Sequence, residues 1–377
     1  MKEINDIISA YQKALAEGIR MALATVVKVE GSSYRQPGAR MLITEDGRLT
    51  GAISGGCLEG DALKKALLAI HQQRNKLITY DTSADSNTEF GVQLGCNGIV
   101  HILFEYIDPT YPNNPVALLE QLKDRRQESV IVTLFSLHRN RQQLGMVLIA
   151  DGDMESNVPY NGEHKEELLQ YARSAIARRQ SFLAILGQGE DQQDVLLEFR
   201  PPSIALHIIG AGNDAKPLVE MADILGWETT VIDGRATHAV PHRFPKAKEV
   251  IPATPEQAIA RTHVDPFTVF VLMTHNYRYD LELLRYLITT ETPYIGSLGP
   301  KTKLLRMLDE LAAEGYTVTE DQKARIFGPV GLHIGAETSE EIALSIISEI
   351  KSVLSYTSGG SLKFLPAKIH PETPALS

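Results

Sequence analysis

The fold of this chain is decided by the stretch Gly210-Ala211-Gly212-Asn213-Asp214-Ala215. An apolar run at 204–209 precedes it, and a helical pattern over 215–225 follows it. A glycine-rich turn that joins a strand to a helix in this way matches the GxGxxA fingerprint of nucleotide-binding α/β folds. The fingerprint also requires an acid at the end of the next strand, about 20 residues further on, and Asp233 occupies that position.

Strand and helix patterns alternate after this turn, which is typical of a parallel sheet with helices on both faces. The expected strands are 204–209, 229–232, 249–251, 267–273, 293–295 and 325–327. The expected helices are 215–225, 255–261, 280–289, 301–313 and 339–356. A capping box of Thr338 and Glu341 opens the last of them. We therefore predict a Rossmann-like doubly wound sheet in the second half, with Gly210, Gly212 and Asp233 in its ligand-binding positions.

The charges around this turn do not decide which ligand it binds. Asp214 places a negative charge beside the helix N-terminus, where a pyrophosphate would sit, and offsets the attraction of the helix dipole. Arg235 is close enough in sequence to pair with Asp233, in competition with a ribose. The alternatives are NAD(P) or another nucleotide, and a Rossmann-like frame with a different ligand.

Two loops after later strands are further candidates for ligand contact. His275 and Asn276 follow the strand at 267–273, and residues just past a parallel strand face the binding crevice of this fold. We expect His275 either to contact a ligand or transfer a proton, or to be a hydrogen-bonded loop residue. The stretch 296–301 is typical of a second anion site or of a tight turn with solvated lysines.

The first half carries Ser54-Gly55-Gly56-Cys57-Leu58-Glu59, between a predicted hairpin and a predicted helix at 60–73. The other cysteine, Cys96, precedes Asn97 and has glycines on both sides of the pair. Glycine lets a ligand approach the backbone closely, so we expect both turns to present a thiol. The thiols would bind a soft metal or a sulfur-bearing cofactor, or form a reversible disulfide. The alternative is two small core residues, and the spacing fits no usual structural zinc site.

Two arginines flank a turn upstream of the first thiol. Arg35 and Arg40 lie on either side of Pro37-Gly38. The planar guanidinium suits phosphate oxygens. Surface arginines are common, so the pair is informative only if it lies near the thiol turns, where we expect it to clamp a phosphate.

The remaining pattern predicts a mixed α+β first half. Helices are expected over 4–15, 60–73 and 163–178, and strands over 21–29, 39–44, 49–53, 76–80, 99–105, 129–137 and 145–150. Within 116–200 a further helix is expected before 129 and two further strands after 178. The pair Pro201-Pro202 has the composition of a linker. We therefore predict an N-terminal domain at 1–200 with a sub-boundary near 107–115, a C-terminal domain at 201–357 and a tail at 358–377.

Composition excludes several classes of protein. The 377 residues are 43% hydrophobic and 22% charged, which is ordinary for a globular chain with a core. The net charge of -10 argues against nucleic acid or an anionic membrane as a partner. The first residues lack the pattern of a signal peptide, and no apolar run reaches the roughly 18 residues of a membrane helix. Two cysteines without CxxC spacing fit a reducing cytoplasm.

Taken in order, these motifs resemble the XdhC/CoxI family. In the first half the resemblance rests on the stretches 31–41, 54–60 and 90–98. In the second half it rests on 210–218, 273–277, 294–296, 329–343 and 359–362. It does not cover the stretch from about 107 to 200, whose role stays open.

The resemblance implies a maturation factor for molybdenum hydroxylases such as xanthine or carbon monoxide dehydrogenase. Such proteins bind the molybdopterin cofactor, help it to receive its terminal sulfide and deliver it to the apoenzyme. The resemblance therefore implies an accessory protein rather than an enzyme, with a cysteine desulfurase as a further partner and a homodimeric state. It implies that the Rossmann half binds the nucleotide-like part of the cofactor or a separate nucleotide. The resemblance assigns Cys57 and Cys96 to the thiol positions and Gly210, Gly212 and Asp233 to the Rossmann positions. Together with the residue patterns above, the candidates for cofactor binding are Arg35, Arg40, Ser54, Gly55, Gly56, Cys57, Glu59, Cys96, Asn97, Gly210, Gly212, Asp233, Arg235, His275 and Asn276, with Cys57 and Cys96 facing the metal.

Two other classes of function remain open on the residues alone. One is an NAD(P)-dependent oxidoreductase, with His275 as proton donor and Asp233 on the ribose. The other is a redox-sensing module in which Cys57 and Cys96 form a reversible disulfide.

Overall fold

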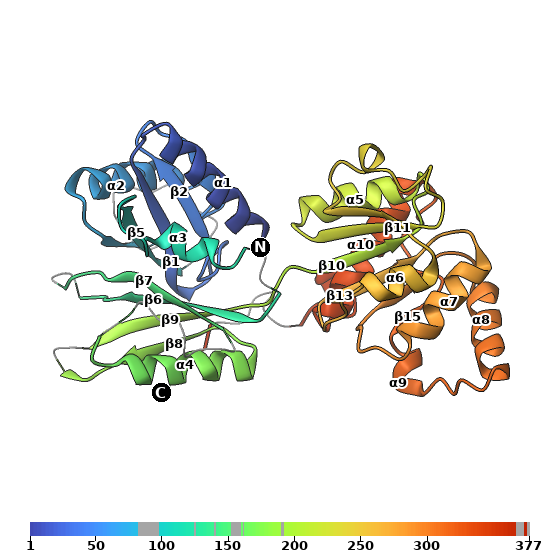
Figure 1. Ribbon diagram of the computed structural model, residues 1–377. Coiled ribbons are helices and arrows are strands. Elements are labelled where there is room, and N and C mark those ends of the chain that lie inside the picture. The colour runs from blue at the N-terminus through green and yellow to red at the C-terminus, as the bar shows by residue number, and fades with distance from the viewer. Residues whose placement is uncertain are drawn as a thin grey trace. The chain divides into compact units, whose positions relative to one another are not determined.

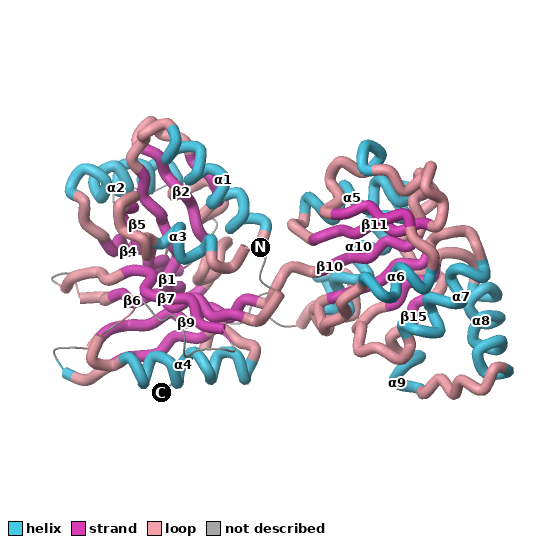
Figure 2. Tube along the Cα trace, in the orientation of Figure 1, coloured by secondary structure: helices cyan, strands magenta, loops and turns pink. Residues whose placement is uncertain are grey.

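The computed structural model describes residues 1–81, 98–123, 126–138, 141–151, 160, 162–189, 192–366 and 373–374. The chain divides into two compact units, an N-terminal unit made mostly of Glu3–Pro202 and a C-terminal unit made mostly of Ser203–Ile369. Both units combine helices with sheets (Figure 1; Figure 2). Among the described residues, none of the helices has both the length and the apolar character needed to cross a bilayer.

The first sheet of the N-terminal unit has five strands in the order β3-β2-β1-β5-β4, and all of its neighbours are antiparallel. Its strands are β1 (Met21–Gly31), β2 (Arg40–Thr44), β3 (Leu49–Gly51), β4 (Lys76–Asp81) and β5 (Gly98–Ile107). Side chains alternate between the two faces of a strand. Leu23 therefore packs with helix α1 (Lys2–Ala16), while Ala22 and Ala24 pack with helix α2 (Glu59–Gln72) on the other face.

The second sheet of this unit has four antiparallel strands in the order β7-β6-β9-β8. They are β6 (Ser129–Phe135), β7 (Gly145–Asp151), β8 (Phe182–Leu186) and β9 (Gln193–Arg200), with helices α3 (Pro115–Glu120) and α4 (Lys165–Arg178). One face packs on α4, and the other shares a core with the first sheet through Val27, Leu103, Phe135 and Leu196. The two sheets of this unit are thus fused into one body.

The C-terminal unit contains a parallel six-stranded sheet in the order β12-β11-β10-β13-β14-β15. The strands are β10 (Ala205–Ile209), β11 (Glu228–Asp233), β12 (Glu249–Pro252), β13 (Thr268–Leu272), β14 (Ile295–Ser297) and β15 (Ile326–Phe327). From β10 the chain adds β11 and β12 on one side of the sheet and then β13, β14 and β15 on the other side. The order of strands therefore reverses between β10 and β13, and ligands bind at such a switch point in doubly wound folds.

Helices cover both faces of this sheet. Helices α5 (Ala215–Ile224) and α10 (Ser339–Leu354) pack on one face, and α6 (Pro255–Arg261), α7 (Tyr277–Leu287) and α8 (Lys301–Ala313) pack on the other. The short helices α9 (Glu320–Lys323), η2 (Pro241–Arg243) and η3 (Leu362–Phe364) complete the unit. The predicted fold class is therefore confirmed: a mixed N-terminal part precedes a Rossmann-like parallel sheet.

Several element boundaries differ from the sequence prediction, and two of them lie next to the carboxyl ends of the parallel strands. Helix α7 begins earlier than expected because the Asn276 side chain caps it, accepting the N–H groups of Arg278 (3.1 Å) and Tyr279 (3.3 Å). Strand β14 lies later than expected, at Ile295–Ser297. The capping box of Thr338 and Glu341 is confirmed at the start of α10.

Candidate functional site

The glycine-rich turn brings the ends of β10 and β13 into close contact. Gly210 has φ +127°, and a Cβ at this position would lie 2.5 Å from the carbonyl oxygen of Met273. Only glycine accommodates both the positive φ and this approach. Helix α5 starts directly after the turn, so its N-terminus points at the carboxyl edge of the sheet.

Asp233 ties the turn to the end of β11. Its carboxylate accepts the N–H of Ala211 at 2.7 Å, and it receives three further bonds from Arg235, one from the backbone and two from the guanidinium. Burial alone would raise the pKa of Asp233, but Arg235 and the two backbone N–H groups outweigh it and lower that pKa. The Asp233 side chain is 3% exposed, so a ribose would have to displace Arg235 to reach it.

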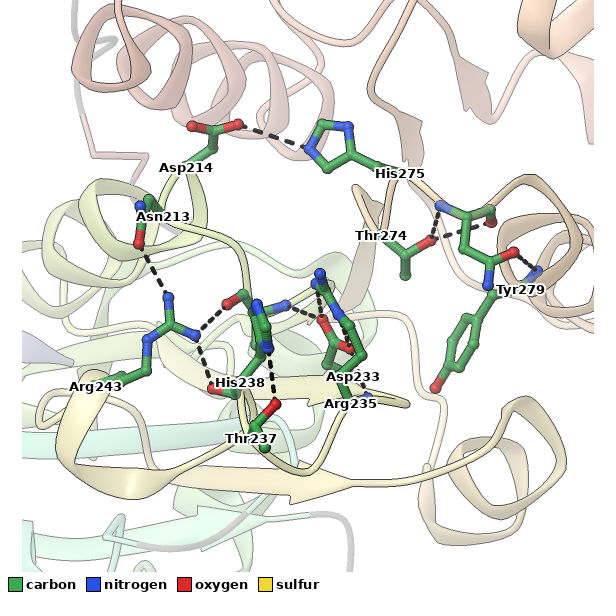
Figure 3. Close-up of polar contacts among 12 residues, drawn as sticks. Asn213, Asp214, Asp233, Arg235, Thr237, His238, Arg243, Thr274, His275 and Tyr279 are labelled. Atoms are coloured by element: carbon green, nitrogen blue, oxygen red, sulfur yellow. Dashed lines mark hydrogen bonds and ion pairs between the residues drawn. The ribbon is translucent and has the colours of Figure 1, made fainter.

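A second arginine that the sequence analysis did not single out braces the same turn (Figure 3). Arg243 donates to the carbonyl of Ala211 at 2.7 Å, to the carbonyl of His238 at 3.0 Å and to Asn213 Oδ1 at 3.0 Å. It lies at the end of η2, far along the chain from the turn. Sequence periodicity could not reveal this contact, because the segment that carries Arg243 has no regular pattern.

His275 lies at the tip of the loop that follows β13. It has φ +58°, which is uncommon for a residue other than glycine and clusters at functional sites. Its neighbour Thr274 fixes the loop by donating to Asp280 at 2.6 Å and accepting the N–H of Asn276 at 3.0 Å. Lys303 closes this network by donating to Asp280 at 2.7 Å, so Lys303 is part of the support of the loop.

The His275 ring is accessible and faces the start of α5. Its Nε2 atom lies 3.8 Å from Asp214 Oδ2, and the two side chains are 67% and 44% exposed (Figure 3). Gly210, Gly212, Asp233, Arg235, His275 and Asn276 all lie at the carboxyl ends of β10, β11 and β13 or in the loops that follow them. This edge combines a helix N-terminus with exposed hydrogen-bonding groups, an arrangement able to bind a polar, anionic ligand.

The cysteine turn of the N-terminal unit is held by its own serine. The hydroxyl of Ser54 accepts the N–H groups of Gly56 (3.2 Å) and Leu58 (3.1 Å) and donates to the carboxylate of Glu59. That carboxylate also accepts the Ser54 N–H at 3.0 Å. Gly56 has φ +106°, so the turn requires glycine there. The predicted site residues Ser54, Gly56 and Glu59 are therefore joined by hydrogen bonds within the turn that carries Cys57.

This loop presents the thiol of Cys57 to solvent. Cys57 is exposed and lies just before helix α2, whose N-cap residue is Leu58. The exposed ring of Tyr34 covers Gly55, where an added Cβ would lie 3.4 Å from the ring. Tyr34 was not predicted as a site residue, although an aromatic residue inside the polar turn at 31–38 is the signal that sequence offers. The turn thus presents an exposed thiol, and an exposed aromatic ring contacts its Gly55. Such a turn can bind a flat ligand that carries a soft metal.

The structure separates the two arginines predicted to clamp a phosphate. Arg35 donates to the carbonyl of Ala52 at 3.1 Å and pairs with Glu3, so it supports the base of the cysteine turn. Arg40 is 1% exposed and pairs with the equally buried Glu198 of β9. The prediction that Arg40 holds a phosphate is therefore corrected, because its guanidinium is enclosed between the two sheets and neutralised there.

The predicted thiol pair and the predicted second anion site complete the set of candidates. Cys96 and Asn97 lie outside the described residues. Within the described ranges, no group of three or more His, Cys, Asp or Glu side chains is arranged to hold a metal ion. At 296–301 the loop after β14 opens α8, and Lys303 is bound to Asp280 and to the carbonyl of Leu298.

Comparison with known proteins agrees with this architecture. The XdhC and CoxI family model matches residues 14–81, and the XdhC Rossmann domain model matches residues 206–350. A Bacillus subtilis (strain 168) protein, named as a probable subunit of xanthine dehydrogenase, is 30% identical over 328 residues, which cover 87% of this chain and 91% of the relative.

Two further similarities extend over most of the chain. The molybdenum cofactor insertion chaperone PaoD of Escherichia coli (strain K12) is 26% identical over 342 residues, covering 90% of this chain and 86% of PaoD. A crystal structure of a xanthine dehydrogenase from Bacillus halodurans is similar with a TM-score of 0.74 and 28% identity, covering 95% of this chain and 98% of that one. With both family models matched and these relatives covered nearly end to end, the chain belongs to the XdhC and CoxI family.

Proposed function

We propose that this chain binds the molybdenum cofactor as cargo, assists its sulfuration and inserts it into a molybdenum hydroxylase apoenzyme of the xanthine dehydrogenase type. The similarity to PaoD, which spans 90% of this chain, supports a role in cofactor insertion. The similarity to a protein named for xanthine dehydrogenase supports the type of apoenzyme. The chain acts as an accessory protein, with a cysteine desulfurase as the source of sulfur and a homodimer as its working form.

The observation that carries this proposal is the exposed thiol of Cys57 on a turn held by its own hydrogen bonds. A molybdenum centre that exchanges an oxo for a sulfido ligand is a partner for thiolate sulfur. Ser54 and Glu59 hold the loop through hydrogen bonds of their own, so the thiol is presented without reorganisation. The Tyr34 ring beside Gly55 offers a flat apolar surface on which a pterin can stack.

The carboxyl edge of the parallel sheet would bind the nucleotide-like end of the cofactor or a separate nucleotide. The N-terminus of α5 favours a phosphate group, and the exposed ring of His275 and the half-exposed guanidinium of Arg235 provide donors at the same edge. The guanidinium of Arg235 already donates two hydrogen bonds to the Asp233 carboxylate. We therefore expect this ligand to bind through its phosphate rather than through a ribose hydrogen-bonded to Asp233.

The direct test is the cofactor content of purified protein. The chain is expressed in a host that makes the cofactor, and molybdenum is measured by mass spectrometry and pterin by the fluorescence of its oxidised form. We expect both to accompany the wild-type chain. The variant Cys57→Ser should lose most of the molybdenum, whereas Lys64→Gln, an exposed change on the same helix α2, should retain it. Absence of molybdenum and pterin from the wild-type chain would reject the proposal.

A second test addresses the C-terminal unit. His275→Ala should weaken retention of the nucleotide-bearing cofactor, because it removes an exposed donor at the carboxyl edge of the sheet. The matched control is His263→Ala, since His263 is also exposed but precedes β13 and lies towards the opposite edge. Equal retention by both variants would remove His275 from the proposal while leaving Cys57 in place.

A further inference from the structure

The N-terminal unit contains a groove that the proposed roles of Cys57 and Tyr34 do not use. It has a volume of about 760 Å³ and lies between the end of α2 with β4 and the connection from β6 to β7. Small-molecule sites commonly have volumes of roughly 300–1,000 Å³. The lining residues are Gln72, Gln73, Arg74, Asn75, Lys76, Leu77, Ile78, Thr79, Ser136, Leu137, Arg141, Gln142 and Gln143.

The groove is lined by three cationic side chains and by no acidic one. Among the described residues, no carboxylate pairs with Arg74, Lys76 or Arg141. The chain as a whole is acidic, with a net charge of -10, and several other arginines of the unit have acidic partners, as Arg20 has Glu45. Arg141 donates to the carbonyl of Gln192 at 2.5 Å, and the carboxylate of Asp194 accepts the N–H of the lining residue Leu137 at 3.2 Å. The net charge of the lining side chains is still positive, which favours an anionic occupant.

The helix dipole accounts for only part of this charge. Arg74 follows the C-terminus of α2, where a cation is favourable in any helix. Lys76 lies beyond the last turn, in β4, and Arg141 comes from the connection after β6. Since the dipole acts within the last turn, these two cations need a separate explanation.

The walls of the groove are held in place by hydrogen bonds. Asn75 donates to the carbonyls of Gln143 (3.1 Å) and Leu144 (3.3 Å) and accepts the N–H of Tyr106 at 3.0 Å. Gln143 exchanges two bonds of 2.9 Å with the backbone of Ser136. The groove is therefore a preformed site, and a ligand would not have to order it.

We propose that this groove binds the phosphate group of a phosphate-bearing small molecule, with Arg74, Lys76 and Arg141 as the contacting cations. Charge-assisted bonds from Arg and Lys are the usual means of holding phosphate. The exposed amides of Gln72 and Gln142 would add hydrogen bonds to the rest of the molecule. The phosphate would be that of a free metabolite rather than of the cofactor bound at Cys57. The groove lies at the C-terminal end of α2 and Cys57 at its N-terminal end, about 20 Å apart at 1.5 Å per helical residue, and this is longer than the span from molybdenum to phosphate in a molybdopterin.

The first experiment measures binding of pyrophosphate and of inorganic phosphate to the full chain by calorimetry. The groove variant is Arg74→Gln with Lys76→Gln, and the control is Lys64→Gln with Arg173→Gln, which removes the same charges from exposed positions on α2 and α4. We expect affinity to fall about tenfold or more in the groove variant and to stay within about twofold in the control. Equal affinity in the two variants, or no binding to the wild type at about 10 mM ligand, would overturn the proposal.

A second variant guards against loss of folding. Gln142→Glu adds a negative charge to an exposed position of the groove and removes no hydrogen bond that the structure shows. It should weaken pyrophosphate binding while thermal unfolding is unchanged, and unchanged binding would count against the site. Pterin content then shows whether the groove is separate from the cofactor site. Unchanged pterin with lost pyrophosphate binding supports a separate site for a free metabolite, and a fall in pterin in the groove variant would contradict it. A wild-type chain that carries no pterin yet binds pyrophosphate rejects the proposed function and supports the groove.

Discussion

The cysteine turn of the N-terminal unit and the glycine-rich turn of the C-terminal unit differ in which residues hold them in place. Both place glycines before a helix N-terminus. The cysteine turn is held by residues within it, since Ser54 and Glu59 bind each other and the loop backbone. The turn at Gly210 is held from distant segments by Asp233 and Arg243. Because the cysteine turn is held from within, the thiol of Cys57 is left exposed. In the turn at Gly210, the carboxylate of Asp233 is used to hold the turn and is already bonded to Ala211 and Arg235.

The two units also contrast in their arginine–carboxylate pairs. Arg40 and Glu198 are 1% and 3% exposed, and they join the two sheets of the N-terminal unit. Arg235 is 48% exposed and pairs with Asp233 at the rim of the parallel sheet. A buried charge that loses its partner is far more costly than a solvated one. Both carboxylates are thus buried, and the pairs differ in the arginine, which is enclosed in the N-terminal unit and accessible in the C-terminal unit.

The largest expected effect is loss of the buried pair. Glu198→Ala leaves the guanidinium of Arg40 uncompensated in the interior, and we expect a loss of about 3–5 kcal/mol in the free energy of unfolding. Urea denaturation measures it. The control Glu17→Ala breaks the exposed pair with Arg48 and should cost less than about 1 kcal/mol. Similar losses in both variants would contradict the contrast between buried and exposed pairs.

The next effect concerns Glu105, which lies between the two sheets of the same unit. Burial raises its pKa to about 7, against smaller lowering effects of the Met146 N–H and of Arg40. The folded state then holds a proton that the unfolded state has already released. Stability from this group is fully present below about pH 4.5 and is lost as pH rises through 7, by about 3 kcal/mol in all.

Unfolding free energies of the wild type and of Glu105→Gln, measured from about pH 5 to about pH 8, test this sign. The neutral amide cannot ionise, so the variant should lose less stability than the wild type as pH rises. A wild-type chain that gains stability from this group over the same interval would refute the assignment.

A smaller effect is expected at the cysteine turn. Ser54→Ala removes the acceptor of the Gly56 and Leu58 N–H groups, and loss of a comparable capping side chain costs about 1 kcal/mol. Ser54→Thr keeps a hydroxyl and should recover most of this stability. Thermal unfolding measures the loss, and retention of molybdenum in the same variants shows whether the turn geometry matters for cargo. Full stability of Ser54→Ala would mean that the turn is not locally held.

The smallest effect belongs to the pair of Arg235 and Asp233 in the C-terminal unit, of which only the arginine is exposed. Arg235→Ala should cost no more than about 1 kcal/mol at neutral pH, because the buried Asp233 carboxylate keeps its two backbone N–H donors. Since Arg235 holds the pKa of Asp233 low, the pair stabilises the fold above the ordinary pKa of an aspartate and loses that effect as pH falls through the lowered pKa. The variant should therefore be less sensitive to acid than the wild type, and an equal acid response would contradict the role of Arg235.

The sequence predicted what depends on local or periodic pattern. Strand and helix alternation indicated the parallel sheet, and the positions of Gly210 and Gly56 follow from conformations that only glycine adopts readily. It did not predict contacts between segments far apart in the chain. The prediction that Arg40 binds phosphate is wrong because its partner Glu198 is 158 residues away in the chain, and no local pattern reveals the pair. The sequence gives no signal for Arg243, because its segment has no periodicity.

The central claim is that Cys57 contacts the molybdenum cofactor as cargo, and protection of its thiol tests this most directly. Chain purified with the cofactor and chain purified without it are treated with iodoacetamide, and alkylation of Cys57 is followed by mass spectrometry. Because the thiol is exposed, the empty chain should react readily. The account predicts that cargo slows this reaction strongly, and equal rates with and without cargo would contradict it.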